Sequence, residues 1–150
     1  VDNFFLNDPT FYSYLLNTLS YSKFRLGDES CLKYFYKTLK IGDSLGNIHI
    51  QLNSKLNLSE YYIEKKDFKK AKFFADDVLK VSKQKEIFQA KLKALELLAT
   101  ADSIKRYNYN KEFITLSDSL QNVERTTRNK FARIEFETDE ITTEKKLVEA

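Results

Sequence analysis

Few residues of this 150-residue chain have the type and spacing that catalysis or metal binding requires. His49 is the only histidine, so neither a metal site built from imidazoles nor a pair of nucleophile and base can be completed around it. Cys31 is the only cysteine, which excludes a disulfide within the chain. It follows Ser30 at a predicted helix start, where a thiolate would be favoured, but packing between helices is the expected role.

Adjacent carboxylates occur at Asp76–Asp77 and at Asp139–Glu140. Neighbouring side chains on a helix point about 100° apart, so neither pair can converge on one cation or one proton. The chain also has no glycine-rich phosphate loop. The sequence therefore predicts a segment that is not an enzyme and that uses no cofactor or metal.

Basic residues gather in two places. The stretch 65–72, "KKDFKKAK", holds five lysines, yet Asp67, Asp76 and Asp77 lie close in sequence and the net charge of the chain is only +3. A solvated helix face is expected there, and we expect no nucleic-acid partner. The run from Arg125 to Arg133 is followed by acidic "EFETDE", an order that argues against contact with anionic lipid.

The elements that position these residues are expected to be helices, because three glycines and one proline are too few for a turn-rich β fold. Apolar residues recur at helical spacing, with Asp8–Pro9 as a start signal. The pattern predicts antiparallel helix hairpins over about 9–43, 47–81 and 86–117. No apolar run is long enough to cross a bilayer.

Three sets of residues recur along these hairpins with the same spacing, first 39 and then 35 residues; each set is called a column below. The phrase "IGDSLGN" at 41–47 is also echoed by "LSDSLQN" at 116–122, and both are read as hairpin exits. Hairpins that cannot cover their own apolar faces must stack, with small residues where the helices approach closely. The columns are corner aspartates (Asp28, Asp67, Asp102), small residues (Ser20, Ser59, Ala94) and apolar residues (Leu39, Val78, Phe113).

The predicted fold class is therefore all-α, a stack of about three antiparallel hairpins over 1–121 followed by a long C-terminal helix over 122–150. The segment 58–81, "LSEYYIEKKDFKKAKFFADDVLKV", resembles a tetratricopeptide repeat, in which this stack is an α-solenoid. The first hairpin resembles the repeat through Leu16, Ser20, Gly27 and Leu39, among other positions. It departs from the pattern at Leu32, and the third hairpin departs from it at Arg106, where Ala71 stands in the second.

The segment 114–141 is similar to the region that joins periplasmic tetratricopeptide repeats to the membrane helix in bacterial sensor histidine kinases. Related regulators with a helix-turn-helix output carry a similar segment. The resemblance implies a periplasmic location, with contact to the membrane only through segments outside this chain; a cytoplasmic location is the alternative. The chain begins at Val1 and contains no Met, so we expect it to be part of a longer protein.

The resemblance also implies a concave surface, lined by the first helix of each hairpin, that binds a protein or peptide. Tyrosine, arginine and asparagine suit peptide recognition. In the alternative, Tyr14 and Phe24 pack beneath earlier repeats. The candidate residues are Tyr14, Asn17, Tyr21, Phe24, Arg25, Asn53, Leu56, Glu60, Ile63 and Glu64.

The C-terminal helix carries apolar residues at heptad-compatible spacing: Phe131, Ile134, Ile141 and Val148. Thr138 and Lys145 occupy the remaining positions of this seam, which predicts a weak homodimer helix. In the alternative, the helix only caps the last hairpin. Two functions are consistent with this pattern. In the first, the chain is the sensor region of a signal-transducing kinase and passes ligand binding to the linker helix. In the alternative, it is a passive scaffold or the repeat region of a helix-turn-helix regulator.

Overall fold

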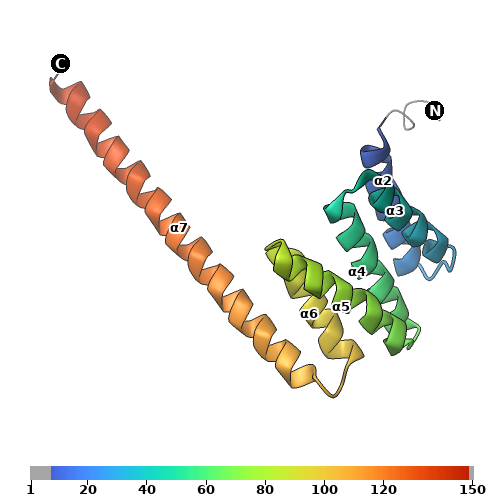
Figure 1. Ribbon diagram of the computed structural model, residues 1–150. Coiled ribbons are helices and arrows are strands. Elements are labelled where there is room, and N and C mark those ends of the chain that lie inside the picture. The colour runs from blue at the N-terminus through green and yellow to red at the C-terminus, as the bar shows by residue number, and fades with distance from the viewer. Residues whose placement is uncertain (1–7, 149–150) are drawn as a thin grey trace. The chain divides into compact units, whose positions relative to one another are not determined.

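A computed structural model describes residues 8–148, apart from the side chains of residues 144 and 146–148. The described chain is all-helical, with no strand in this range. Contacts divide it after Phe113 into two units, residues 1–113 and 114–150, and each is described by itself. The helices, shown in Figure 1, are α2 (Pro9–Arg25), α3 (Cys31–Leu45), α4 (Ile48–Glu64), α5 (Phe68–Gln84), α6 (Phe88–Ala101) and α7 (Arg106–Val148).

Polar side chains cap the starts of three helices, α2, α4 and α5. The Asp8 carboxylate accepts a hydrogen bond from the Phe11 amide at 3.0 Å, with Pro9 as the first helical residue of α2. The side chain of Asn47 accepts from two amides at the start of α4. The side chain of Asp67 accepts from the Lys70 amide at the start of α5. Each cap satisfies amides that have no partner inside the helix.

The residues that follow the first four helices share one backbone conformation. The backbone adopts positive φ at Gly27 and at Gly46, after the first and second helices. Lys66 and Glu86 adopt the same conformation at the corresponding places in the second hairpin, with φ of 59° and 54°. A left-handed residue ends a helix by turning the chain out of it. The repeat is therefore visible in the backbone even where glycine is missing.

Asp28, one of the corner aspartates, lies before the start of the second helix and does not cap it. The N-cap of α3 is Ser30, and Asp28 instead accepts from the Ser30 amide at 2.9 Å, in the turn before the helix. The ammonium group of Lys23 lies 2.6 Å from the Asp28 carboxylate, and together with the bonds from Ser30 it holds the pKa of that carboxyl well below its usual range.

The helix after α6 differs from the sequence expectation. The sequence pattern predicted a hairpin that ends at about residue 117 and a separate helix from residue 122, but α7 runs unbroken from Arg106 to Val148 (Figure 1). In "IGDSLGN", Gly46 supplies the left-handed residue that ends α3. Gln121 stands at the corresponding place in "LSDSLQN", and no glycine or proline lies between residues 106 and 148. The echo in sequence lacks the residue that stops a helix.

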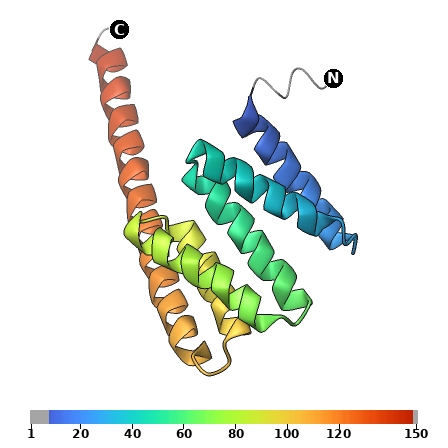
Figure 2. The same cartoon turned by 45° about the vertical axis from the view of Figure 1, so that its right-hand side comes forward.

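Within residues 8–113 the helices form the expected stack of hairpins. Consecutive helices pack together from α2 to α6, and α4 also packs against both α2 and α6, so the first helices of the three hairpins are neighbours (Figure 2). Ser20, Ser59 and Ala94 are fully buried, as the small-residue column predicted. The Ser59 hydroxyl donates to the Ala71 carbonyl at 2.9 Å, which ties α4 to α5 where they approach closely.

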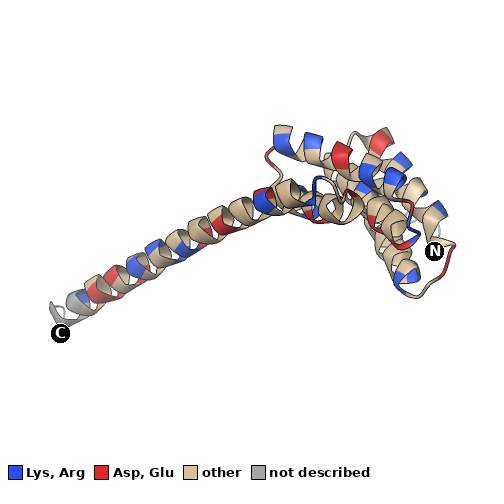
Figure 3. Cartoon of the chain, turned by 90° about the horizontal axis from the view of Figure 1, so that it is seen from below, with Lys and Arg blue, Asp and Glu red and all other residues tan. Residues whose placement is uncertain are grey.

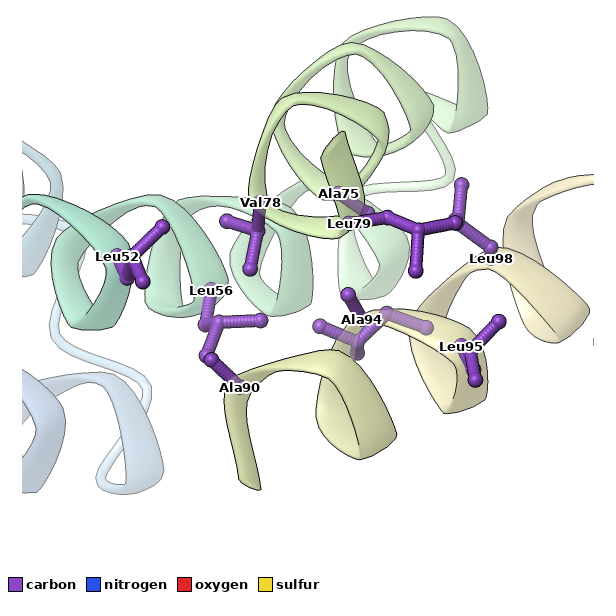
Figure 4. Packing of buried hydrophobic residues seen from close by; sticks show 10 residues of the cluster. Leu52, Leu56, Ala75, Val78, Leu79, Ala90, Ala94, Leu95 and Leu98 are labelled. Atoms are coloured by element: carbon purple, nitrogen blue, oxygen red, sulfur yellow. The ribbon is translucent and has the colours of Figure 1, made fainter. Parts of the chain in front are cut away.

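The apolar core of residues 8–113 consists of two clusters of buried side chains. One lies between α4, α5 and α6, and Figure 4 shows its side chains converging from these three helices. The other is rich in aromatic rings and joins α2 and α3 to α4 and α5. Ile63 is partly buried and packs against both clusters. The two clusters make the hairpins one continuous core, in which each hairpin covers its neighbour.

Candidate functional site

In the described part of the chain, the side chains that could react or bind a metal lie apart from one another. His49 is exposed, and among residues 8–148 no group of three or more His, Cys, Asp or Glu side chains could hold a metal ion. Cys31 is buried, and this burial, with the nearby charges of Glu29 and Asp28, raises the pKa of its thiol. Among the described helices, none combines the length and the apolar composition that crossing a bilayer requires.

The lysine-rich stretch 65–72 is largely neutralised by carboxylates. Lys65 pairs with Glu29, Lys70 with Asp67 at 3.1 Å, and Lys72 with Asp102. Two of these pairs, those to Glu29 and Asp102, join neighbouring hairpins. In Figure 3, ribbon segments at Lys and Arg positions alternate with segments at Asp and Glu positions along the chain. Charges that are paired in this way provide little of the continuous positive surface that nucleic acid would require.

Two pairs of polar side chains join the first helices of the first and second hairpins on the predicted concave surface. The Tyr21 hydroxyl donates to the Glu60 carboxylate at 3.1 Å. The side-chain Nδ2 of Asn57 donates to the side-chain Oδ1 of Asn17 at 2.8 Å. Partial burial, followed by the charge of Glu60, raises the pKa of Tyr21. The structure thus pairs two of the candidate residues, Tyr21 and Glu60, with each other, and pairs a third, Asn17, with Asn57.

Two residues assigned to the concave surface lie in the core instead. Phe24 is 5% exposed and packs edge-on against Phe35, and Leu56 is 9% exposed in the cluster between α4, α5 and α6. Neither side chain is available to a partner. The assignment was wrong at these two positions because a helix in a stack buries side chains toward its neighbours on more than one side, and repeat position alone does not separate those sides.

The other candidates keep accessible surface. Tyr14, Asn17 and Asn53 lie around a small crevice of about 10 Å³ between α2, α3 and α4, which is also lined by buried Ser13, Thr38 and Ile50. At the other end of the same helices, Arg25 and Glu64 are exposed and Ile63 is partly buried. These residues present aromatic, amide and charged groups on rigid helices, which suits the recognition of a peptide.

Sequence reasoning missed four residues that join the first two hairpins: Asn57, Glu29, Tyr61 and Lys65. Asn57 pairs with Asn17, 40 residues away, a separation close to the repeat interval that could have revealed it. The Tyr61 hydroxyl and the Lys65 ammonium both donate to Glu29. Burial, together with the hydrogen bond to Glu29, raises the pKa of Tyr61 to about 12. No local pattern marks this group, because Glu29 lies in a turn.

The predicted seam on α7 is open to solvent where the structure describes it. Phe131, Ile134 and Ile141 are 66%, 47% and 55% exposed. The side chain of Val148, the fourth seam residue, lies outside the described residues. The Thr138 hydroxyl donates to the Ile134 carbonyl at 2.7 Å, so this seam position has its polar group satisfied within the helix.

The comparisons with known proteins identify no relative: no family model, no curated protein and no solved structure matches this chain.

Proposed function

We propose that this chain is a non-catalytic, partner-binding segment of the tetratricopeptide type that passes the binding of a protein or peptide to a dimerising linker helix, α7. In its fullest form, the proposal is that the chain is the periplasmic sensor region of a bacterial sensor histidine kinase. The similarity of segment 114–141 to such linkers supports this form of the proposal. The stack of hairpins and the polar groups on α2 and α4 support the binding role.

The observation that carries the proposal is the exposure of α7. Every described side chain from residue 121 to residue 143 is exposed, and this stretch includes large apolar side chains at Phe131, Ile134 and Ile141. A helix of this length gains its stability mainly from packing an apolar face, and exposed apolar stripes mark interaction sites. A second copy of the chain would cover the stripe with the same residues.

The seam is built to be weak, which suits a switch. Its apolar residues are interrupted by Thr138 and Lys145. Nearby charged side chains form ion pairs within the same helix: Glu124 pairs with Arg128 at 2.9 Å, and Arg133 pairs with Glu137 at 2.7 Å. Such charges are not reserved for a partner helix. Two packings that differ by only a few kcal/mol can be biased by a ligand.

Sedimentation of residues 1–150, beside a chain shortened to residues 1–122, tests the dimer. We expect the longer chain to dimerise reversibly and the shorter one to stay monomeric. Phe131→Glu should weaken the dimer at least about tenfold, because it places a charge in the seam. Phe136→Glu is the matched control, since Phe136 is 63% exposed and lies off the seam on the same helix.

The proposal of a signalling dimer fails if residues 1–150 stay monomeric at all accessible concentrations, or if the two phenylalanine variants weaken association equally. In that case the scaffold becomes the better hypothesis. The accessible side chains of Tyr14, Asn17 and Asn53 favour this second candidate, because they lie on α2 and α4 and need no contribution from α7. A repeat region of a helix-turn-helix regulator would share this surface.

A further inference from the structure

An open cleft lies in the third hairpin, between the C-terminal half of α6 and the first two turns of α7. It has a volume of about 310 Å³ and is lined by Glu96, Ala99, Thr100, Arg106, Asn110 and Phe113. All six residues belong to the unit 1–113. The volume is at the lower end of the range for small-molecule sites, which suits a ligand smaller than a folded partner or a long peptide.

The cleft exists because the third hairpin departs from the repeat at two positions. Arg106 and Asn110 stand 35 residues after Ala71 and Ala75, which are both fully buried in the second hairpin. In that hairpin the small side chain of Ala71 lets the Ser59 hydroxyl reach the Ala71 carbonyl. In the third hairpin, large polar side chains replace both alanines, so the corresponding surface is polar and open.

Arg106 is anchored at one end only. Its Nε donates to the Ala99 carbonyl at 2.9 Å, across the two helices. Among the described residues, neither terminal nitrogen of this guanidinium makes a hydrogen bond or an ion pair. A guanidinium that is held by Nε and keeps both terminal nitrogens free presents paired donors, which match the two oxygens of a carboxylate.

The other polar groups of the cleft are already occupied or neutral. Both oxygens of Glu96 lie 3.2 Å from the Lys93 ammonium, and the Thr100 hydroxyl donates to the Glu96 carbonyl. The Asn110 amide is neutral and exposed. Phe113 packs against the core cluster and supplies an apolar wall next to Ala99, which is 8% exposed. The cleft thus combines one positive charge without a partner in the described residues with an apolar surface.

We propose that this cleft binds a small organic carboxylate whose body is apolar and about the size of a leucine side chain. Arg106 holds the carboxylate, Phe113 and Ala99 contact the apolar body, and Asn110 bonds to a polar group between them. The proposal rests on the proposed sensing function, for which it identifies the ligand class. Three of the lining residues belong to α7, the helix that carries the seam. The ligand would therefore bind at the N-terminal end of the proposed linker helix.

Titration of ¹⁵N-labelled residues 1–150 with N-acetyl-leucine tests the site, with N-acetyl-leucinamide as the probe that lacks the charge. For a ligand of this size we expect a Kd on the order of 1 mM and saturable shifts at the side-chain amide of Asn110. The amide probe should bind at least about tenfold more weakly, because it cannot form the charged, paired hydrogen bonds.

Arg106→Gln should weaken N-acetyl-leucine at least about tenfold, whereas Arg125→Gln, which removes the same charge from the exposed part of α7, should leave the Kd within about twofold. Asn110→Asp places a carboxylate in the cleft and should abolish binding while the helical circular dichroism is unchanged. It keeps the test decisive if Arg106→Gln unfolds.

Equal affinity for the acid and the amide, equal losses in the two arginine variants, or no saturable shift at about twenty times the expected Kd would overturn the proposal. Association through α7 is measured separately, by sedimentation. If the chain dimerises but does not bind the probe, the carboxylate site is wrong and the sensor proposal stands. If the chain binds the probe but stays monomeric, the site stands and the dimer is wrong.

Discussion

Replacing Gly42 by alanine tests how closely α3 and α4 approach. Gly42 lies inside α3 and is buried. A Cβ built at this position would lie 2.9 Å from Ile50 Cγ2 and 3.0 Å from the backbone nitrogen of Gln51, both in the first turn of α4. Carbon atoms pack best at about 3.5–4.0 Å, so the new methyl overlaps both atoms. One of them is backbone and cannot move without shifting α4.

Two opposing terms set the expected change in the free energy of unfolding. Glycine to alanine inside a helix normally stabilises by about 1 kcal/mol. Overpacking a close contact costs about 1–3 kcal/mol, and here relief would disturb the start of α4, where Asn47 caps the helix and the amide of Asn47 donates to the Gly42 carbonyl at 3.0 Å. We expect the overlap to win, with a net loss of about 1 kcal/mol.

Urea unfolding followed by circular dichroism at 222 nm measures this change for Gly42→Ala and for Ser44→Ala. Ser44 is exposed two residues further along α3, so its replacement should leave stability unchanged or raise it by up to about 0.5 kcal/mol. Gly42→Ala should lower the midpoint at unchanged m-value. If Gly42→Ala is as stable as the wild type or more stable, α3 and α4 do not approach as described, and the reasoning is refuted.

Two further predictions concern buried hydroxyls and titrating tyrosines. Ser59→Ala should cost about 1 kcal/mol because Ser59 donates to the Ala71 carbonyl, whereas Ser54→Ala should be neutral or stabilising because the buried Ser54 hydroxyl has no hydrogen-bond partner in the described structure. Equal losses in urea unfolding would contradict this account. Burial, and the hydrogen bond of each hydroxyl to Tyr62 or to Glu29, raises the pKa of Tyr36 and of Tyr61 from 10 to about 12. The folded chain therefore holds these protons more tightly than the unfolded chain, and the resulting stabilisation is complete below about pH 10 and is lost as the pH rises toward 12. Absorbance at 295 nm should show both hydroxyls titrating near pH 12 and one fewer in Tyr61→Phe; titration of both near pH 10 would exclude these partly buried hydrogen-bonded pairs.

Much of the local structure could be predicted from the sequence because helix starts and ends depend on neighbouring residues. Asp8, Asn47 and Asp67 mark helix starts that the structure confirms, and the column of Ser20, Ser59 and Ala94 predicts fully buried positions. The continuity of α7 was also within reach of the sequence, since Gln121 stands where Gly46 ends α3. The similarity of the two heptapeptides predicted a helix end there, but the glycine that ends α3 has no counterpart in the second.

Only the tertiary structure decided which side chains remain free to act. Phe24 and Leu56 share the spacing of exposed candidates but are buried by neighbouring hairpins, and Asn57 acts through a residue 40 positions away. Arg106 looked like a departure from the repeat, whereas the structure shows it anchored to Ala99 beside an open cleft. Helix limits follow from local hydrogen bonding, which the sequence encodes directly. Exposure and cleft shape depend on side chains from several helices, which meet only when the hairpins stack.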